Sequence, residues 1–362
     1  MALHKVELPG SATLLFDVVE LQERLLEALS VPALVASQVD TAWVQNVWQN
    51  QDTEWVRKFC LGGKESVLIP LTLLANASPL ARESLYVEFR RQRDVPAILE
   101  AGGDFREIAS LPGFNAKLAN EVTRLFKQFY KLLSHKTASE WPGYAFGQQE
   151  LSNRSYKREF CSTYPTLSVC PYCDQDIGTS KLDHYYAKSL VPLLACNPWN
   201  LVPVCSSCNE IGAKEDNPAF YTGPPRSTTE WLHPFNRPAS SLTTITISGP
   251  PSDPKPTLVS TDLTEIVPLQ NHTNMIQTLA TRWNGKVVSY ADKLSGDIGR
   301  RRLKDSGFDI DAFVSECLED QEAERGRSSN TLIFSAVCRA VLSRRTGYID
   351  EIFDSNPPTF AS

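Results

Sequence analysis

The sequence predicts a mainly α-helical protein with a small α+β module between two helical parts. Two regions, before about residue 155 and after about residue 269, carry apolar residues at helical spacing. Between them stand two C-x-x-C pairs, a histidine and short strand-like segments. A chain of 362 residues exceeds what one hydrophobic core usually covers. We therefore expect a helical domain over 1–155, the zinc-containing module over 156–240, and a connector with a helical domain over 241–362.

Three segments of the first domain carry helix signals. Apolar residues recur at helical spacing over 14–29. Ser78 followed by Pro79 is typical of an N-cap and a first helical position, which predicts a helix that ends near Arg93. The clearest apolar stripe runs over 115–133, with lysines and an arginine largely off it.

The segment 218–268 contains ten of the 24 prolines and many Ser and Thr residues. This composition predicts an extended connector or wrapping arm. Within it, the alternation of Thr and Ile over 242–248 indicates a strand. Helices are predicted again from about 269, and the last of them covers about 329–353.

Composition indicates a protein of the cytoplasm. No apolar run approaches the roughly 18 residues that a membrane span needs, so we expect no membrane partner. The first residues lack the basic region and apolar core of a secretory signal. The net charge of −6 argues mildly against a nucleic-acid partner, but a local basic groove can coexist with acidic flanks.

Four of the nine cysteines form the pattern C-x2-C-x31-C-x2-C. Two residues between thiolates let each pair clamp one ion, and two clamps complete a tetrahedral set of four sulfurs that suits Zn²⁺. The alternatives are four unrelated buried cysteines or a redox pair. The ligands expected for zinc are Cys170, Cys173, Cys205 and Cys208, whereas Cys60, Cys161, Cys196, Cys317 and Cys338 are expected to be small apolar residues.

The 31 residues between the clamps carry the other candidate site residues. Asp183 and His184 are adjacent, so on an extended strand they face opposite sides. One can bind a metal ion while the other faces substrate. Asn209 directly follows a cysteine of the second clamp, and we expect it to begin a helix that runs through Lys214 and brings its amide oxygen near Asp183.

Three segments carry a specific resemblance: Cys-Pro-Tyr-Cys, Leu-Asp-His-Tyr-Tyr-Ala-Lys-Ser and Asn-Leu-Val-Pro-Val-Cys-Ser-Ser-Cys-Asn. Together they resemble the HNH (ββα-metal) endonuclease motif in its zinc-stapled, four-cysteine variant. The resemblance covers roughly 165–216. It implies a β-hairpin and a helix around a catalytic metal ion, and a phosphodiester hydrolase that leaves 5′-phosphate and 3′-hydroxyl ends.

The resemblance also assigns roles. Asp183 and Asn209 would hold a divalent ion, Mg²⁺ or Mn²⁺, which suits oxygen ligands and stabilises a scissile phosphate. His184 would be the general base, since an imidazole with a pKa near 6.5 can take a proton from water at neutral pH. Asn200 would brace the loop that orients it. The third family position is often His, and here it is Asn209.

Further residues are candidates for substrate contact or for structure. Lys188 is expected to contact phosphate or to be solvated, and Lys214 is the nearest counterpart of a lysine that relatives carry three residues after the last Asn. His233 would be a further metal ligand or would pack against the module. Three basic faces are candidates for DNA contact or ordinary solvated helix faces: Arg90, Arg91 and Arg93; Lys117, Arg124, Lys127 and Lys131; and Arg300 to Arg302 with Lys304.

The predicted function is therefore hydrolysis of DNA phosphodiester bonds. The motif variant resembles HNH proteins of bacterial anti-phage systems, many of which act beside an ATPase subunit, so an ATPase or sensor protein is an expected partner. The alternatives are a zinc-stabilised module that binds nucleic acid or a partner without cleaving, and a nuclease that acts on RNA. Target sequence, activating signal and oligomeric state are not encoded in these patterns.

Overall fold

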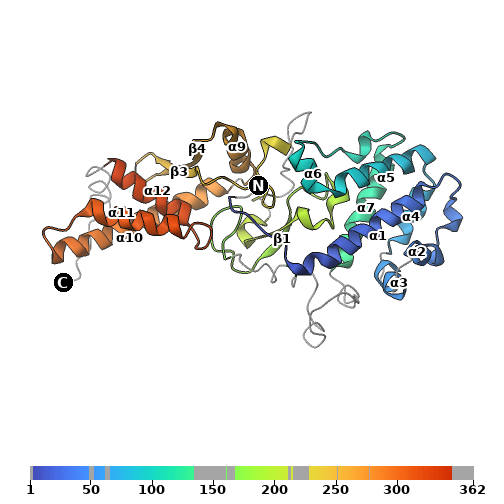
Figure 1. The fold of residues 1–362 in the computed structure, drawn as a ribbon, viewed down its shortest axis with the longest axis horizontal. Coiled ribbons are helices and arrows are strands. Elements are labelled where there is room, and N and C mark those ends of the chain that lie inside the picture. The colour runs from blue at the N-terminus through green and yellow to red at the C-terminus, as the bar shows by residue number, and fades with distance from the viewer. Residues whose placement is uncertain are drawn as a thin grey trace.

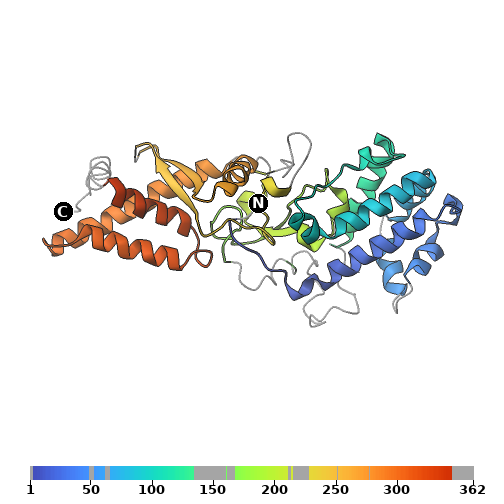
Figure 2. The same cartoon turned by 45° about the horizontal axis from the view of Figure 1, so that its top comes forward.

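The structure is a computed structural model of the chain, and it is mainly helical. It describes residues 3–48, 53–61, 66–133, 160, 168–210, 213–214, 228–250, 252–276 and 278–344. The N-terminal helices lie at one end of an elongated molecule and the C-terminal helices at the other (Figure 1). The segment with the four cysteines lies between them, and a view turned by 45° shows the same order (Figure 2). The central segment is therefore in a position to contact both helical parts.

Seven helices are described in the N-terminal part. The predicted helix over 14–29 is confirmed as α1, which buries one side among its neighbours. Ser78 caps α5 by accepting a hydrogen bond from the backbone of Ala81, and Asn115 caps α7 in the same way through Leu118. The helices are α1 (Thr13–Ser30), α2 (Thr41–Val47), α3 (Thr53–Leu61), α4 (Leu68–Ala75), α5 (Pro79–Arg93), α6 (Val95–Glu100) and α7 (Ala116–Leu132).

The central segment contains a two-stranded antiparallel sheet. Strand β1 (Lys181–His184) pairs with β2 (Leu201–Val204), with Asp183 opposite Val202 and His184 opposite Leu201. Every residue of β2 is buried. Strand β2 is thus buried on both faces, whereas β1 has only His184 buried.

The described part of 218–268, which its prolines predict to be an extended connector or wrapping arm, contains a β-hairpin. The predicted strand over 242–248 is confirmed as β3 (Thr243–Ser248), and it pairs with a second strand, β4 (Lys255–Ser260), which the proline content obscures. The hairpin packs on two C-terminal helices, β3 on α12 and β4 on α10. The C-terminal helices are α9 (Ile266–Met275), α10 (Leu279–Lys304), α11 (Ile310–Ala323) and α12 (Thr331–Arg344).

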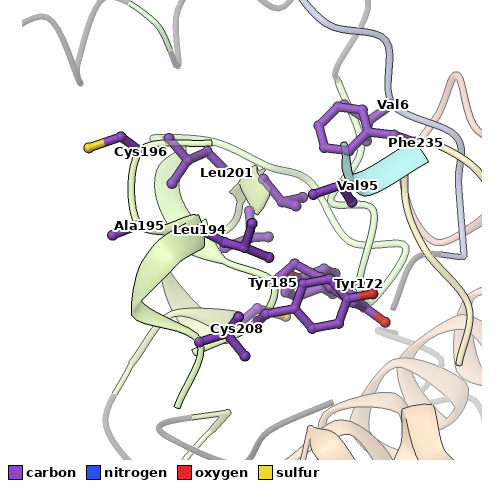
Figure 3. Close-up of a cluster of buried hydrophobic side chains, with 14 of the residues drawn as sticks. Val6, Val95, Tyr172, Tyr185, Leu194, Ala195, Cys196, Leu201, Cys208 and Phe235 are labelled. Atoms are coloured by element: carbon purple, nitrogen blue, oxygen red, sulfur yellow. The ribbon is translucent and has the colours of Figure 1, made fainter. Parts of the chain in front are cut away.

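Buried apolar side chains connect the central segment to the rest of the chain. Tyr172 and Tyr185 are fully buried, and Figure 3 shows them in one cluster with Leu194 and Cys208 from the same segment. Val95 of α6 lies in the same close-up. The segment thus shares its core with other elements, and its position follows from that packing.

Candidate functional site

The four cysteines of the two C-x-x-C pairs meet in one buried cluster. Their sulfur atoms all lie within 4.8 Å of one another, and the Sγ atoms of Cys173 and Cys205 are 3.7 Å apart. Sulfurs of a tetrahedron with metal–sulfur bonds of ~2.3 Å are ~3.8 Å from each other. The donor set and its spacing therefore fit a metal ion such as zinc.

Burial makes a counter-ion necessary if these sulfurs are thiolates. It raises the pKa of the Cys170 thiol well above the usual value, because a charged sulfur loses its hydration there. A bound divalent cation reverses that balance, since it stabilises the deprotonated form of every ligand. Of the remaining cysteines, Cys60, Cys196 and Cys338 are buried and Cys317 is half-buried, while Cys161 lies outside the described residues.

Asp183 lies on β1 and makes two strong polar contacts. Its Oδ2 accepts a hydrogen bond from the Tyr172 hydroxyl at 2.9 Å and forms an ion pair with the Lys214 ammonium at 2.6 Å. Lys214 is 2% exposed and also donates to the backbone oxygen of His184 at 2.5 Å. The structure thus places a cation directly on the carboxylate that the sequence singles out as a metal ligand.

His184 faces a different set of neighbours from Asp183, as adjacent residues of a strand should. Its Nε2 lies 3.0 Å from the backbone oxygen of Ala195, and the side chain is buried. Because a carbonyl oxygen only accepts, Nε2 carries the proton and Nδ1 is the basic nitrogen. The ring also meets the edge of Tyr130 from α7, with centroids 4.3 Å apart.

Asn200 is fully buried and bonds to the loop that follows His184. Its Oδ1 accepts from the backbone N–H of Tyr186 at 2.7 Å. Its Nδ2 lies 3.1 Å from the backbone oxygens of Tyr186 and Leu194. One amide side chain thus ties the end of β1 to the chain that leads into β2.

Asn209 is exposed at the end of the second clamp, next to a short 3-10 turn over Ser206–Cys208. Residues 209–210 form a bend and 213–214 a turn, so the predicted helix through Lys214 is wrong for these four residues. Ala213 donates to the carbonyl oxygen of Glu210, three residues before it, as in a turn, whereas an α-helix joins residues four apart.

Lys188 and His233 lie close to this segment in different surroundings. The Lys188 ammonium stands 5.4 Å over the ring of Tyr130, the same ring that contacts His184. His233 is buried with its ring 4.6 Å from that of Tyr185, and burial lowers its pKa well below the usual value. In the structure, His233 packs against the module, which is one of its two expected roles.

The predicted basic faces are partly neutralised. Arg90 and Arg93 of α5 pair with Glu23 of α1, and Arg91 pairs with Glu88.

A cleft of about 640 Å³ beside Trp199 is lined by four carboxylates and two arginines. The lining consists of Phe16, Val19, Glu20, Glu23, Arg24, Glu27, Arg93, Asp94, Asn197 and Trp199. This cleft has the wrong charge for a phosphate backbone.

Sequence reasoning missed the residues that surround the cysteine cluster. Arg282 of α10 points both terminal nitrogens at the cluster, and Trp283 donates to the backbone oxygen of Cys173 at 3.0 Å. His272 of α9 bonds to the backbone oxygen of Tyr172 at 2.7 Å. These residues are about 100 positions from the first clamp, and no local pattern marks them.

No family model, no curated protein and no solved structure matches this chain. Within the residues that the structure describes, no helix is both long enough and apolar enough to cross a membrane.

Proposed function

We propose that the chain is a metal-dependent endonuclease of the HNH type whose reacting residues stand on β1, in a module that the cysteine cluster holds together. One observation carries the proposal. Asp183 and His184 are neighbours on a strand that lies between the two clamps, and the buried Asn200 bonds to the loop directly after His184. A candidate metal ligand and a candidate base held in fixed positions are what metal-assisted water activation needs.

The proposed base is His184. With Nε2 directed at the oxygen of Ala195, Nδ1 would be the nitrogen that takes a proton from an attacking water. The contact with Tyr130 fixes the plane of the ring. His184 would therefore keep one orientation and one tautomer, which general-base catalysis requires.

Asp183 and Asn209 are the residues that would hold the divalent ion. Bound there, Mg²⁺ or Mn²⁺ would neutralise charge on the scissile phosphate. Asp183 Oδ2 already accepts from Lys214 and Tyr172. Ion binding therefore requires Lys214 to leave Oδ2 or requires use of the other carboxylate oxygen.

The test is plasmid nicking by zinc-loaded wild type and by His184→Ala, with Mg²⁺ or Mn²⁺ supplied or omitted. Loss of a general base predicts a fall of about 100-fold or more in rate. Glu319→Gln, a change on the exposed face of α11, is the matched control. Cleavage by His184→Ala at the wild-type rate would eliminate the proposed role of His184.

A binding module without catalysis is the second candidate, and the buried ion pair of Lys214 with Asp183 favours it. A carboxylate permanently satisfied by an ammonium is a structural element. If folded, zinc-loaded wild type cleaves neither DNA nor RNA with any divalent ion but binds one of them, this candidate replaces the first. A defence role and an ATPase or sensor partner stay predictions, and the nicking assay repeated with proteins that co-purify from the host addresses them.

A further inference from the structure

The turn that carries the first cysteine pair is bonded by segments from both ends of the chain. Four consecutive carbonyl oxygens each accept a hydrogen bond from a distant residue. Leu3 N–H donates to Pro171 at 2.6 Å, His272 Nε2 to Tyr172 at 2.7 Å, Trp283 Nε1 to Cys173 at 3.0 Å and Asn330 N–H to Asp174 at 2.5 Å. A turn whose four successive carbonyl oxygens bond to other elements is a docking point for them.

The side chain of Asp174 accepts further hydrogen bonds at the same turn. It is fully buried with a left-handed backbone (φ 62°), a conformation that costs energy for a non-glycine residue. It accepts from His4 Nε2 at 2.7 Å and from the backbone N–H of Leu332, in the first turn of α12, at 2.8 Å. The residue directly after Cys173 thus connects the cysteine cluster to the N-terminal segment and to α12.

Arg282 brings a positive charge to the sulfurs themselves. Its Nη2 lies 3.2 Å from Cys208 Sγ, and its Nη1 lies 3.8 Å from Cys173 Sγ and 3.4 Å from Gln175 Oε1. One guanidinium therefore spans both clamps. A guanidinium keeps its positive charge in proteins.

The charge of a zinc–thiolate centre explains why a cation stands there. Four thiolates and one Zn²⁺ carry a net charge of about −2, and a buried charge of that size needs compensation. Among the side chains described within hydrogen-bond distance of the sulfurs, Arg282 is the cation. A planar fork of N–H donors reaches two sulfurs at once, which a lysine ammonium does less well.

We propose that Arg282 is the outer-sphere cation of the metal–thiolate centre, and that metal in this centre holds α9, α10 and α12 against the central segment. Metal binding fixes the turn over 170–175, whose carbonyl oxygens accept hydrogen bonds from residues at those helices. The negative charge of the metal–thiolate centre attracts the guanidinium of Arg282. Loss of metal removes both attachments. This inference does not rest on the proposed nuclease activity.

The first test follows zinc release from the full-length, zinc-loaded protein into a chromogenic chelator. Outer-sphere changes typically weaken metal binding about 10-fold to 100-fold. We expect Arg282→Met to release zinc at least about 10-fold faster than wild type and Arg282→Lys to fall between them, since it keeps the charge and loses the fork. Arg300→Met, an exposed change on the same helix, is the control and should match wild type.

The second test needs only wild type and therefore tests the attachment of the helices even if Arg282→Met fails to fold. Backbone amide exchange is compared in zinc-loaded and zinc-stripped protein. We expect the first turns of α10 and α12 to lose protection on stripping, while α1 and α5, which pack on each other, keep theirs. Release at the wild-type rate from folded Arg282→Met, unchanged protection of α10, or equal loss throughout the chain would each overturn the proposal.

Discussion

The buried ion pair between Asp183 and Lys214 makes a quantitative prediction about stability. Asp183→Asn removes the carboxylate and leaves the Lys214 ammonium, 2% exposed, without a counter-charge. Breaking a buried pair by removing one partner costs about 3–5 kcal/mol. Two acceptors remain, the backbone oxygen of His184 at 2.5 Å and the new amide oxygen, so we expect the lower end, a loss of about 3 kcal/mol.

The matched control is Asp297→Asn, which breaks the exposed pair of Asp297 and Arg300 on α10. Exposed pairs contribute roughly 0–1 kcal/mol, so the two variants should differ by about 2 kcal/mol or more. Urea unfolding at neutral pH with zinc bound and no added Mg²⁺ measures both. The midpoint should fall for Asp183→Asn, with the slope of the free energy of unfolding against urea unchanged.

A double variant separates a lost ion pair from general damage at this site. Asp183→Asn with Lys214→Met removes the stranded charge, and replacement of both partners of a buried pair is often neutral. We expect the double variant to recover most of the stability that Asp183→Asn loses. If Asp183→Asn costs no more than Asp297→Asn, or if the double variant is less stable than Asp183→Asn, the ion pair does not have the role that its burial indicates.

Two further changes test neighbouring groups. Asn200→Ala removes the buried amide that bonds to the backbone N–H and the backbone oxygen of Tyr186. We expect the free energy of unfolding in urea to fall by about 2–4 kcal/mol. A fall below about 1 kcal/mol would contradict the bracing role of Asn200. Burial lowers the pKa of His272 from 6.5 to about 3, so the unfolded chain binds a proton below pH 6.5 that the folded chain does not. This group should therefore lower the free energy of unfolding by about 1 kcal/mol between pH 7 and pH 5.5. The free energy of unfolding of His272→Gln should fall less over the same pH range. An equal fall in wild type and in His272→Gln would refute the lowered pKa of His272.

The sequence was sufficient for elements whose signals are local. Helix α5 begins at Pro79 after its Ser78 cap, and α7 begins after Asn115, because a cap and an apolar stripe act within a few residues. The described part of the last predicted helix is confirmed as α12, Thr331–Arg344. The four cysteines also meet as their spacing predicts, because two residues between thiolates suffice to form each clamp.

Local signals failed where a segment's structure depends on partners far along the chain. Strand β4 contains Pro256 yet pairs with β3, since the hairpin packs on α10 and α12 and proline is tolerated in an edge strand. The helix expected after Asn209 is replaced, in its described residues, by a bend and a turn. Helical propensity is a weak prior, and tertiary contacts override it.

The same contrast between local signals and distant contacts applies to the residues of the candidate site. The order and spacing of Cys170, Cys205, Asp183 and His184 are enough to select them as candidate site residues. Their surroundings become known only from the folded chain. It places Lys214 on Asp183 across 31 residues and Arg282 on Cys208 across 74. Such contacts depend on how separate elements pack, and packing is a property of the whole fold that no spacing along the chain encodes.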